Sequence, residues 1–191
     1  MTPQGLLPVV YRFYPRGVDE YDPGYKDTEQ HRRLVRARVQ AGADGNPWGI
    51  LLERIRAHFP GAIMHNGSTH LPTGQMDGGY VGWLELPPRG WYEVHRKIGF
   101  LISFLAPCYV IYGASIIIAP TTSGRTQELR FTFPPDEDPY VRTITGEILS
   151  VFPGYELIPP EVGNVIVPDV VAGNKMMGQT TLYLCLFTDA W

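Results

Sequence analysis

Hydrophobic and polar residues follow two different periods along this chain, and the two periods predict different elements. The segment LPVVYRFY, residues 7–14, is rich in β-branched and aromatic residues and predicts a first strand. Residues 28–41 and 47–59 instead place apolar residues three and four positions apart, which predicts two amphipathic helices. Asp27 or Thr28 is the expected N-cap of the first helix, because short polar side chains cap helix starts.

The middle of the chain predicts mainly strands. Apolar runs bounded by Gly and Pro indicate strands at residues 62–64, 80–86, 91–104, 108–118 and 128–133. A third amphipathic helix is expected at residues 140–152. The apolar segment TTLYLCLF, residues 180–187, predicts a closing strand.

One apolar segment is long enough to raise the question of a membrane span. Residues 98–118 contain no charged side chain and meet the length criterion for a transmembrane helix. Pro107 stands near the middle, where it would break a helix, and the segment is rich in β-branched residues and tyrosine. Two buried strands that form a central hairpin therefore explain the segment better than a membrane helix.

The order of these elements predicts an α+β fold. Runs of strands between isolated helices favour a mainly antiparallel sheet with about three helices packed on one face, in a single domain spanning residues 1–191. Two segments, ILLERIRAHFPGAIM and TITGEILSVFPGYELI, both indicate a helix ended by Phe-Pro-Gly. A true repeat would give two similar halves of one sheet, but Pro and Gly are also ordinary helix stop signals.

Composition narrows the class of protein without identifying it. The 21 glycines and 18 prolines favour short elements with many turns over a helical bundle. A formal net charge of −3 argues against direct nucleic-acid binding by the whole surface. Cys108 and Cys185 each lie in an apolar run, which predicts buried, reduced thiols. Because the first residues do not match a secretion signal, we expect a cytoplasmic protein.

The segment AIMHNGSTHLPTGQMDGG, residues 62–79, looks more like a chemical site than any other. It contains His65 and His70, followed by Gln75 and Asp77. The spacing matches no zinc-binding motif, and a catalytic zinc site needs about three protein ligands. The turn-forming Asn-Gly and Gly-Gly pairs predict a surface loop that could serve recognition, and a metal-binding or catalytic loop is the alternative.

Motifs for nucleophilic catalysis are not found in the sequence. Neither Ser103 nor Ser115 lies in a GxSxG motif, and no phosphate-binding glycine loop is present. Cys108 could be paired with His95, but a cysteine within a strand is usually inert. Carboxylate pairs are available, as in any chain with 19 acidic residues, from Glu85, Glu93 and Glu147. We therefore expect no catalytic residues, no metal and no cofactor.

Two acidic clusters are the most distinctive surface features. They are VDEYD, residues 18–22, and PPDEDP, residues 134–139. Such loops either keep a protein soluble or form a docking surface for a basic partner, where charge complementarity raises the association rate. Neighbouring tyrosines would be suitable anchors for a partner. The candidate partner-binding residues are Asp19, Glu20, Tyr21, Asp22, Tyr25, Asp136, Glu137 and Asp138.

Four segments together resemble a family of bacterial immunity proteins. They are WGILLERIRAHFP (48–60), ISFLAPCYVIYG (102–113), PGYELIPPEVGNVIVPDV (153–170) and TLYLCLF (181–187). The layout resembles immunity proteins of polymorphic-toxin systems, especially the immunity protein 52 family. The resemblance covers most of the chain and consists of soft sequence patterns rather than a catalytic signature.

The resemblance implies a small, cytoplasmic, non-enzymatic α+β protein that binds and neutralises a cognate toxin. For this family the implied toxin is a nuclease with a restriction-endonuclease-like fold, so the partner is a protein rather than nucleic acid or a membrane. The resemblance assigns no individual contact residues. The sequence leaves open a small hydrolase or metal-dependent enzyme with an unfamiliar site, or a structural oligomer, and it does not specify the oligomeric state.

Overall fold

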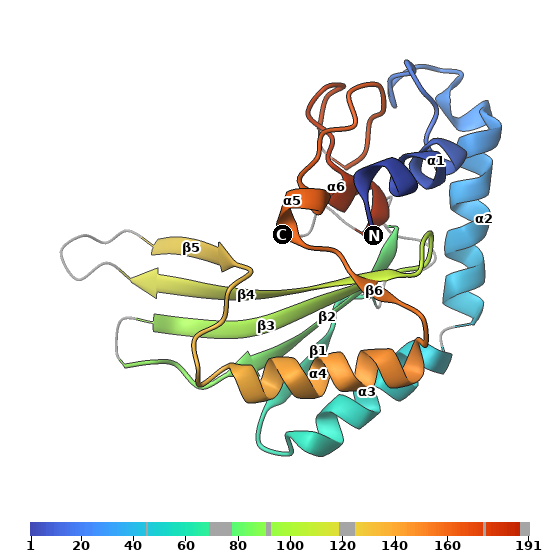
Figure 1. The fold of residues 1–191 in the computed structure, drawn as a ribbon. Coiled ribbons are helices and arrows are strands. Elements are labelled where there is room, and N and C mark those ends of the chain that lie inside the picture. The colour runs from blue at the N-terminus through green and yellow to red at the C-terminus, as the bar shows by residue number, and fades with distance from the viewer. Residues whose placement is uncertain (45, 69–77, 91–92, 119–124, 174, 188–191) are drawn as a thin grey trace.

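The computed structural model of the chain describes residues 1–44, 46–68, 78–90, 93–118, 125–173 and 175–187. Its centre is an antiparallel sheet in the order β1-β2-β3-β4-β5 (Figure 1). The strands are β1 (Ile63–Asn66), β2 (Gly79–Leu86), β3 (Glu93–Ser103), β4 (Cys108–Ile118) and β5 (Arg125–Arg130). A short strand, β6 (Glu156–Leu157), pairs in parallel with the start of β4. The predicted α+β fold with a mainly antiparallel sheet is confirmed.

Helices precede and follow the strands. They are α1 (Pro3–Phe13), α2 (Glu29–Ala43), α3 (Asn46–His58), α4 (Asp138–Val151), and the short helices η1 (Tyr25–Asp27), α5 (Pro160–Gly163) and α6 (Leu182–Leu186). The helices α2, α3 and α4 form where amphipathic spacing predicted them. Thr28, rather than Asp27, caps α2, because its hydroxyl accepts a hydrogen bond from the backbone N–H of His31 at 3.2 Å.

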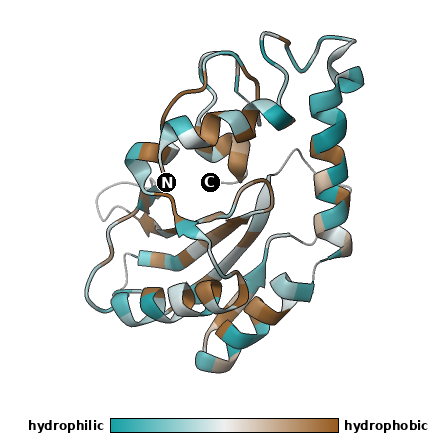
Figure 2. Cartoon of the chain, turned by 45° about the vertical axis from the view of Figure 1, so that its right-hand side comes forward, coloured by the Kyte–Doolittle hydropathy of each residue, from teal (hydrophilic) through white to brown (hydrophobic). Residues whose placement is uncertain are grey.

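The lower face of the sheet, as drawn in Figure 1, is covered by α3 and α4. The core on this side includes the buried side chains of Trp48, Leu51, Leu52, Ile55, Leu84, Ile98, Phe100, Ile102, Ile111, Ile144 and Ile148. Figure 2 shows hydrophobic residues along α3 and α4, and mostly hydrophilic residues along α2 at the side of the molecule. Burial of these two amphipathic helices therefore closes one side of the sheet.

The upper face is covered by α1, by α5 and α6, and by the segment that connects α5 to α6. The core on this side includes Leu6, Val10, Leu34, Val81, Leu101, Val110, Tyr112, Val167, Leu182, Cys185, Leu186 and Phe187. The sequence predicted about three helices on one face, whereas the structure divides the helices between two faces. The reason is that β3 and β4 carry buried apolar residues at consecutive positions, so both of their faces need cover.

The N-terminal strand predicted at residues 7–14 is wrong, because this segment belongs largely to helix α1. Thr2 caps the helix, and Pro3 stands in the first turn, where its missing N–H would be unpaired in any case. Leu6 and Val10, one helical turn apart, are buried together in the upper core. Packing of this stripe overrides the strand preference of the β-branched residues.

The closing strand predicted at residues 180–187 is also wrong, because the segment forms the short helix α6. Every residue of α6 is buried, and a short, continuous apolar run does not distinguish a strand from a buried helix. The segment packs on the upper face of the sheet rather than along an edge. A helix suits this place because it pairs its own backbone, as in the 3.1 Å bond from Cys185 N–H to the Thr181 carbonyl.

The two Phe-Pro-Gly segments end α3 and α4 as predicted, but they lead into different strands. After α3 the chain enters β1, which is antiparallel to β2. After α4 it enters β6, which is parallel to β4. Gly154 after α4 has a φ of 82°, whereas Gly61 after α3 does not have a positive φ. The similarity therefore extends over the helix and its stop signal, but not over the strand that follows.

The uncharged segment at residues 98–118 forms the end of β3, a turn and β4, as predicted. Gly99 and Tyr112 are paired across these two strands, and a Cβ atom at Gly99 would lie only 2.1 Å from Tyr112 Cζ. Glycine is therefore required where the tyrosine ring crosses the neighbouring strand. No helix formed by the described residues is long and apolar enough to cross a membrane.

Burial of both thiols predicts slow labelling of the native protein. Cys108 and Cys185 are free and fully buried. A thiol reagent should therefore label neither residue rapidly until denaturant is added, when both should react. Replacing Cys185→Ala should lower the free energy of unfolding by about 1–2 kcal/mol through a small cavity. Rapid labelling of either residue without denaturant would contradict this burial.

Candidate functional site

Helices cover only part of the upper face of the sheet. Figure 1 shows β4 and β5 extending to the left beyond α5 and α6. The strand register brings side chains from five strands onto this uncovered part. We call it the open sheet face, and it consists of Ile63, His65, Trp83, Glu85, His95, Lys97, Ile116, Gln127 and Leu129.

Trp83 is the aromatic centre of the open sheet face. The His65 ring stacks on it at a centroid distance of 4.9 Å and an interplanar angle of 12°. The Lys97 ammonium lies 5.2 Å from the ring centroid, within range of a cation–π contact. Trp83 is half-buried against the upper core. The ring is therefore held in place while part of it stays accessible.

Glu85 is held by two histidines. Nε2 of His65 lies 3.0 Å from one carboxylate oxygen, and Nδ1 of His95 lies 3.2 Å from the other. The hydrogen bonds with His65 and with His95 lower the pKa of Glu85, which keeps the carboxylate ionised at neutral pH. Both oxygens of Glu85 are therefore engaged within the protein.

Among the described residues, Lys97 has no ion-pair partner of this kind. It lies opposite Glu85 in the strand register, but the Glu85 carboxylate is paired with the histidines. Within the described ranges, no carboxylate lies at ion-pair distance from the Lys97 ammonium. Burial lowers the pKa of Lys97, which is the direction expected when a cation loses water without gaining an anion. Lys97 is thus a half-buried cation available to an outside group.

A hollow of about 220 Å³ opens on this face. Its lining includes Trp83, Glu85, His95, Lys97, Ile116 and Gln127. The hollow thus combines an aromatic wall, an apolar side chain, a lysine and an amide. A glutamate and a histidine also line it, and polar groups placed beside an aromatic wall can fix the orientation of a bound group.

A β-bulge in β3 keeps Glu93 off this face. The pairing register with β4 shifts between Glu93 and His95. In a regular strand, residues three apart point to opposite faces, yet Glu93 and Arg96 point to the same, lower face, where their side chains lie 3.5 Å apart. Without the bulge, Glu93 would share the open sheet face with His95 and Lys97, which are two residues apart and point to the same face in any regular strand.

The histidine segment singled out in the sequence is partly a strand. His65 and Asn66 belong to β1, and Asn66 Oδ1 accepts hydrogen bonds from Trp48 Nε1 at 3.0 Å and from Ser68 N–H at 2.9 Å. Asn66 therefore connects β1 to α3, while His65 joins the open sheet face. The remaining polar residues of the predicted site lie outside the described residues: His70, Gln75 and Asp77.

The first acidic cluster lies in the connection between α1 and η1, and most of it is accessible. Asp19, Tyr21 and Asp22 are exposed, and Glu20 is half-buried. Tyr25 is buried instead, with its ring 5.2 Å from the His31 ring, and burial raises the pKa of Tyr25 to about 12. Of the predicted contact residues here, Tyr25 is therefore a core residue that is not placed to meet a partner.

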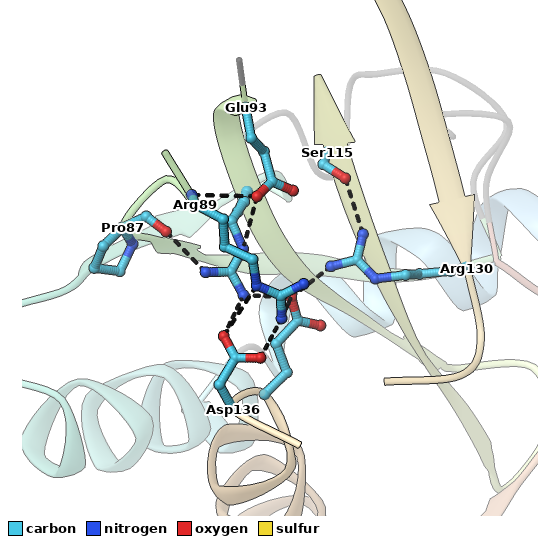
Figure 3. Close-up of polar contacts among 8 residues, drawn as sticks. Pro87, Arg89, Glu93, Ser115, Arg130 and Asp136 are labelled. Atoms are coloured by element: carbon cyan, nitrogen blue, oxygen red, sulfur yellow. Dashed lines mark hydrogen bonds and ion pairs between the residues drawn. The ribbon is translucent and has the colours of Figure 1, made fainter. Parts of the chain in front are cut away.

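In the second acidic cluster, Glu137 and the exposed Asp136 form an ion-pair network with three arginines (Figure 3). Glu137 is fully buried, and its Oε1 accepts hydrogen bonds from Arg96 at 2.7 Å and from Arg130 at 2.5 Å. Asp136 accepts from Arg89 at 3.1 Å and from Arg96 at 2.9 Å, and these bonds lower the pKa of Asp136. Within this cluster Asp138 is exposed, whereas Glu137 is not placed to contact a partner.

This network fixes the start of α4 on the lower face of the sheet. Glu137 is the N-cap of α4, while Arg96 comes from β3 and Arg130 from the end of β5. Arg130 also donates to the Ser115 hydroxyl at 2.9 Å (Figure 3). The guanidinium charges are balanced by Glu93, Asp136 and Glu137. The acidic segment therefore has a structural role that its sequence does not reveal.

The residues considered for catalysis in the sequence do not assemble. His95 and Cys108 lie at opposite ends of the β3–β4 hairpin, and burial raises the pKa of Cys108 to about 12. The Ser103 hydroxyl donates to the Gly78 carbonyl at 3.2 Å and accepts from Leu105 N–H at 3.1 Å. Glu147 lies on α4 and is hydrogen bonded to His58 at 2.8 Å. Ser103 and Glu147 instead join neighbouring segments.

Sequence reasoning missed Trp83 and Lys97 as site residues. The available signal was alternation: Trp83 and Glu85 are two apart on one predicted strand, and His95 and Lys97 are two apart on the next. Such pairs share one face of a sheet. The strand register, which brings the two pairs together, is not readable from the sequence.

We expect the purified protein to carry no stoichiometric zinc. His65, Glu85 and His95 are ligand types that zinc accepts, but the carboxylate lies between the two rings and engages each through a different oxygen. In the described part of the chain, no three His, Cys, Asp or Glu side chains are arranged to hold a metal ion. Elemental analysis after incubation with zinc and dialysis tests this. Retention of about one zinc per chain, lost in His65→Ala but not in His58→Ala, would contradict the expectation.

Removing Glu137 should destabilise the protein strongly. In Glu137→Ala the buried Arg96 loses a carboxylate partner, and breaking a buried ion pair typically costs about 3–5 kcal/mol. We expect the free energy of unfolding to fall by about 3 kcal/mol, the lower end of this range, because Asp136 still contacts Arg96. Asp138→Ala, at the exposed neighbouring position, should change stability by no more than about 0.5 kcal/mol. Urea denaturation measures both, and equal effects would show that the network does not hold α4.

Comparison of the chain with protein-family models, with curated proteins and with solved structures finds no match.

Proposed function

We propose that this protein binds and neutralises a cognate bacterial toxin, a nuclease, by binding alone and without chemical turnover. The observation that supports a binding role is the open sheet face, where a rigid sheet presents a fixed aromatic ring. Trp is among the residues most often responsible for binding energy in protein interfaces. The toxin as partner comes from the resemblance of the sequence to immunity proteins.

The edges of the open sheet face also suit a protein partner. Ile63 on β1 is 60% exposed and Leu129 on β5 is 40% exposed, and these residues lie on opposite edge strands of the main sheet. Exposed apolar side chains on both edges, with polar groups near the centre, make a broad amphipathic surface. A surface of this kind favours another protein over a small ligand that fills only the hollow.

The acidic loop with Asp19, Glu20 and Asp22 offers a second, electrostatic contribution. None of the described arginines or lysines lies at ion-pair distance from these three carboxylates, whereas Asp136 and Glu137 are neutralised by arginines. An unpaired acidic loop attracts a basic protein and raises its association rate. A nuclease has to carry positive charge toward its nucleic-acid substrate, so such a loop is complementary to it.

An enzymatic function is the second candidate, and one observation favours it. His65, Glu85 and His95 form a hydrogen-bonded group beside a hollow, which is a geometry that general acid–base catalysis uses. Ser115 lines the hollow, but its hydroxyl is bonded to Arg130 on the lower face. Among the described residues, no hydroxyl or thiol is hydrogen bonded to His65 or His95. We therefore prefer the binding role.

Survival of cells tests the proposed function. A product of the neighbouring open reading frame should be toxic when expressed alone and harmless when expressed with this protein, and the two should co-purify. The protecting protein should remain unmodified and show no hydrolysis of model esters or nucleic acid. If no neighbouring product is toxic, or if toxicity persists while both proteins are soluble, the proposal is wrong.

Charge reversal of the acidic loop tests its role in the encounter. Replacing Asp19, Glu20 and Asp22 by Lys should slow association with the toxin by about tenfold at low salt and change dissociation little. The effect should fade as salt shortens the Debye length to about 8 Å at physiological ionic strength. Stopped-flow or surface-plasmon-resonance kinetics provide the measurement.

A matched control separates local charge from net charge. Asp44 at the end of α2, Glu53 on α3 and Glu161 on α5 are exposed, and replacing these three residues by Lys changes the net charge by the same amount. This second triple variant should associate nearly as fast as the unmodified protein. Equal slowing of both variants would show that the acidic loop has no special role.

A further inference from the structure

We infer that the open sheet face recognises an acidic side chain of the partner protein, whose carboxylate pairs with Lys97 in the hollow beside Trp83. The identification of that partner with the toxin rests on the proposed function. The chemistry of the hollow itself follows from the geometry of this chain.

Lys97 is the residue that defines the ligand. Its ammonium group is half-buried, faces the hollow and has no carboxylate at ion-pair distance within the described part of the chain. The neighbouring anion, Glu85, has its two oxygens engaged by His65 and His95. A partly desolvated cation of this kind gains most when an anion replaces the water that it has lost.

The rest of the lining fits a single carboxylate rather than a phosphate. Gln127 supplies an amide that can donate a hydrogen bond, and the other walls include Trp83 and Ile116. Phosphate and nucleic-acid sites usually contain arginines or several cations around the anion. Here the nearby arginine, Arg96, points to the lower face and is paired with Glu137, and Glu85 opposes a more highly charged ligand.

The surroundings of the hollow indicate that the carboxylate belongs to a protein. Ile63 and Leu129, on the two edge strands, remain exposed on the same face. The hollow would take the carboxylate and its short alkyl stem, while the exposed apolar side chains would contact the surface around it. Packing of the alkyl stem on Trp83 and Ile116 would exclude water and strengthen the ion pair.

The hollow can be tested without the partner. Blocked glutamate, N-acetylglutamic acid α-methylamide, is titrated into ¹⁵N-labelled protein and followed by NMR, with the blocked glutamine analogue and inorganic phosphate as comparisons. We expect shifts at Trp83, His95, Lys97 and Gln127 with blocked glutamate and not with blocked glutamine. The shifts should disappear in Lys97→Met and persist in Lys175→Met, which removes an exposed lysine elsewhere.

The partner is tested with the co-expressed toxin. Lys97→Met should raise the dissociation constant of the complex by at least about tenfold, because a hydrogen bond to a charged group is lost. Lys97→Arg should restore part of the affinity, and Lys175→Met should leave it unchanged. Thermal unfolding of each variant checks that the sheet remains folded. We expect little change in Lys97→Met, because the Met side chain can still cover the Trp83 ring.

The possible results separate this inference from the proposed function. The absence of shifts with blocked glutamate, or stronger shifts of the same residues with phosphate, overturns carboxylate recognition even if the protein still protects cells. Toxin binding that is unchanged in Lys97→Met overturns the assignment of the hollow to the toxin. Specific shifts with blocked glutamate, in the absence of any toxin binding, support the chemistry of the hollow and refute the immunity function.

Discussion

Both faces of the central strands have to be kept from water, and most of the fold depends on this constraint. In β3 and β4, consecutive residues are buried, and consecutive residues of a strand point to opposite faces. The helices α3 and α4 cover one face. The other face is covered by segments from both ends of the chain, which are joined where the Tyr14 hydroxyl donates to the Cys185 carbonyl at 2.8 Å.

At one end of the sheet the described helices leave part of the upper face uncovered. Polar residues of β3 lie on both faces there. Strand alternation directs Arg96 to the lower face and His95 and Lys97 to the upper face, and the bulge after Glu93 places Glu93 on the lower face with Arg96. Below, Arg96 meets Glu137 in a buried network that positions α4. Such a network is costly to desolvate and costly to break, so its main effect is to fix one arrangement. On the upper face the groups remain accessible, because none of the described helices extends over them.

The open sheet face and the acidic loop would contribute to the proposed binding function in different ways. A sheet with both central strands packed is a rigid support, so Trp83 and Lys97 are held in place before a partner arrives. Groups that are already ordered lose less conformational entropy on binding. The acidic loop at Asp19 is exposed and needs no fixed geometry, since long-range attraction depends on charge more than on orientation. Under the proposed function, the open sheet face and the acidic loop can therefore be altered independently.

The sequence by itself determined the elements whose patterns have one physical interpretation. The helices α2, α3 and α4 show apolar stripes of helical period, and β2, β3 and β4 show apolar runs bounded by turns, so their types and approximate positions were predicted correctly. The burial of Cys108 and Cys185 followed from their apolar neighbours. In each case local pattern and tertiary environment favour the same structure.

Only the tertiary structure decided the rest, because the deciding contacts join residues far apart in the chain. Residues 7–14 and 180–187 have strand-like composition but pack on a sheet face, where a helix pairs its own backbone. The sequence predicts an exposed Glu137, but in the structure it is buried and hydrogen bonded to Arg96 and Arg130. The open sheet face depends on strand register, on one bulge and on where the helices end. These features depend on which distant segments pack on the apolar faces of the sheet, and a local sequence pattern contains no information about that packing.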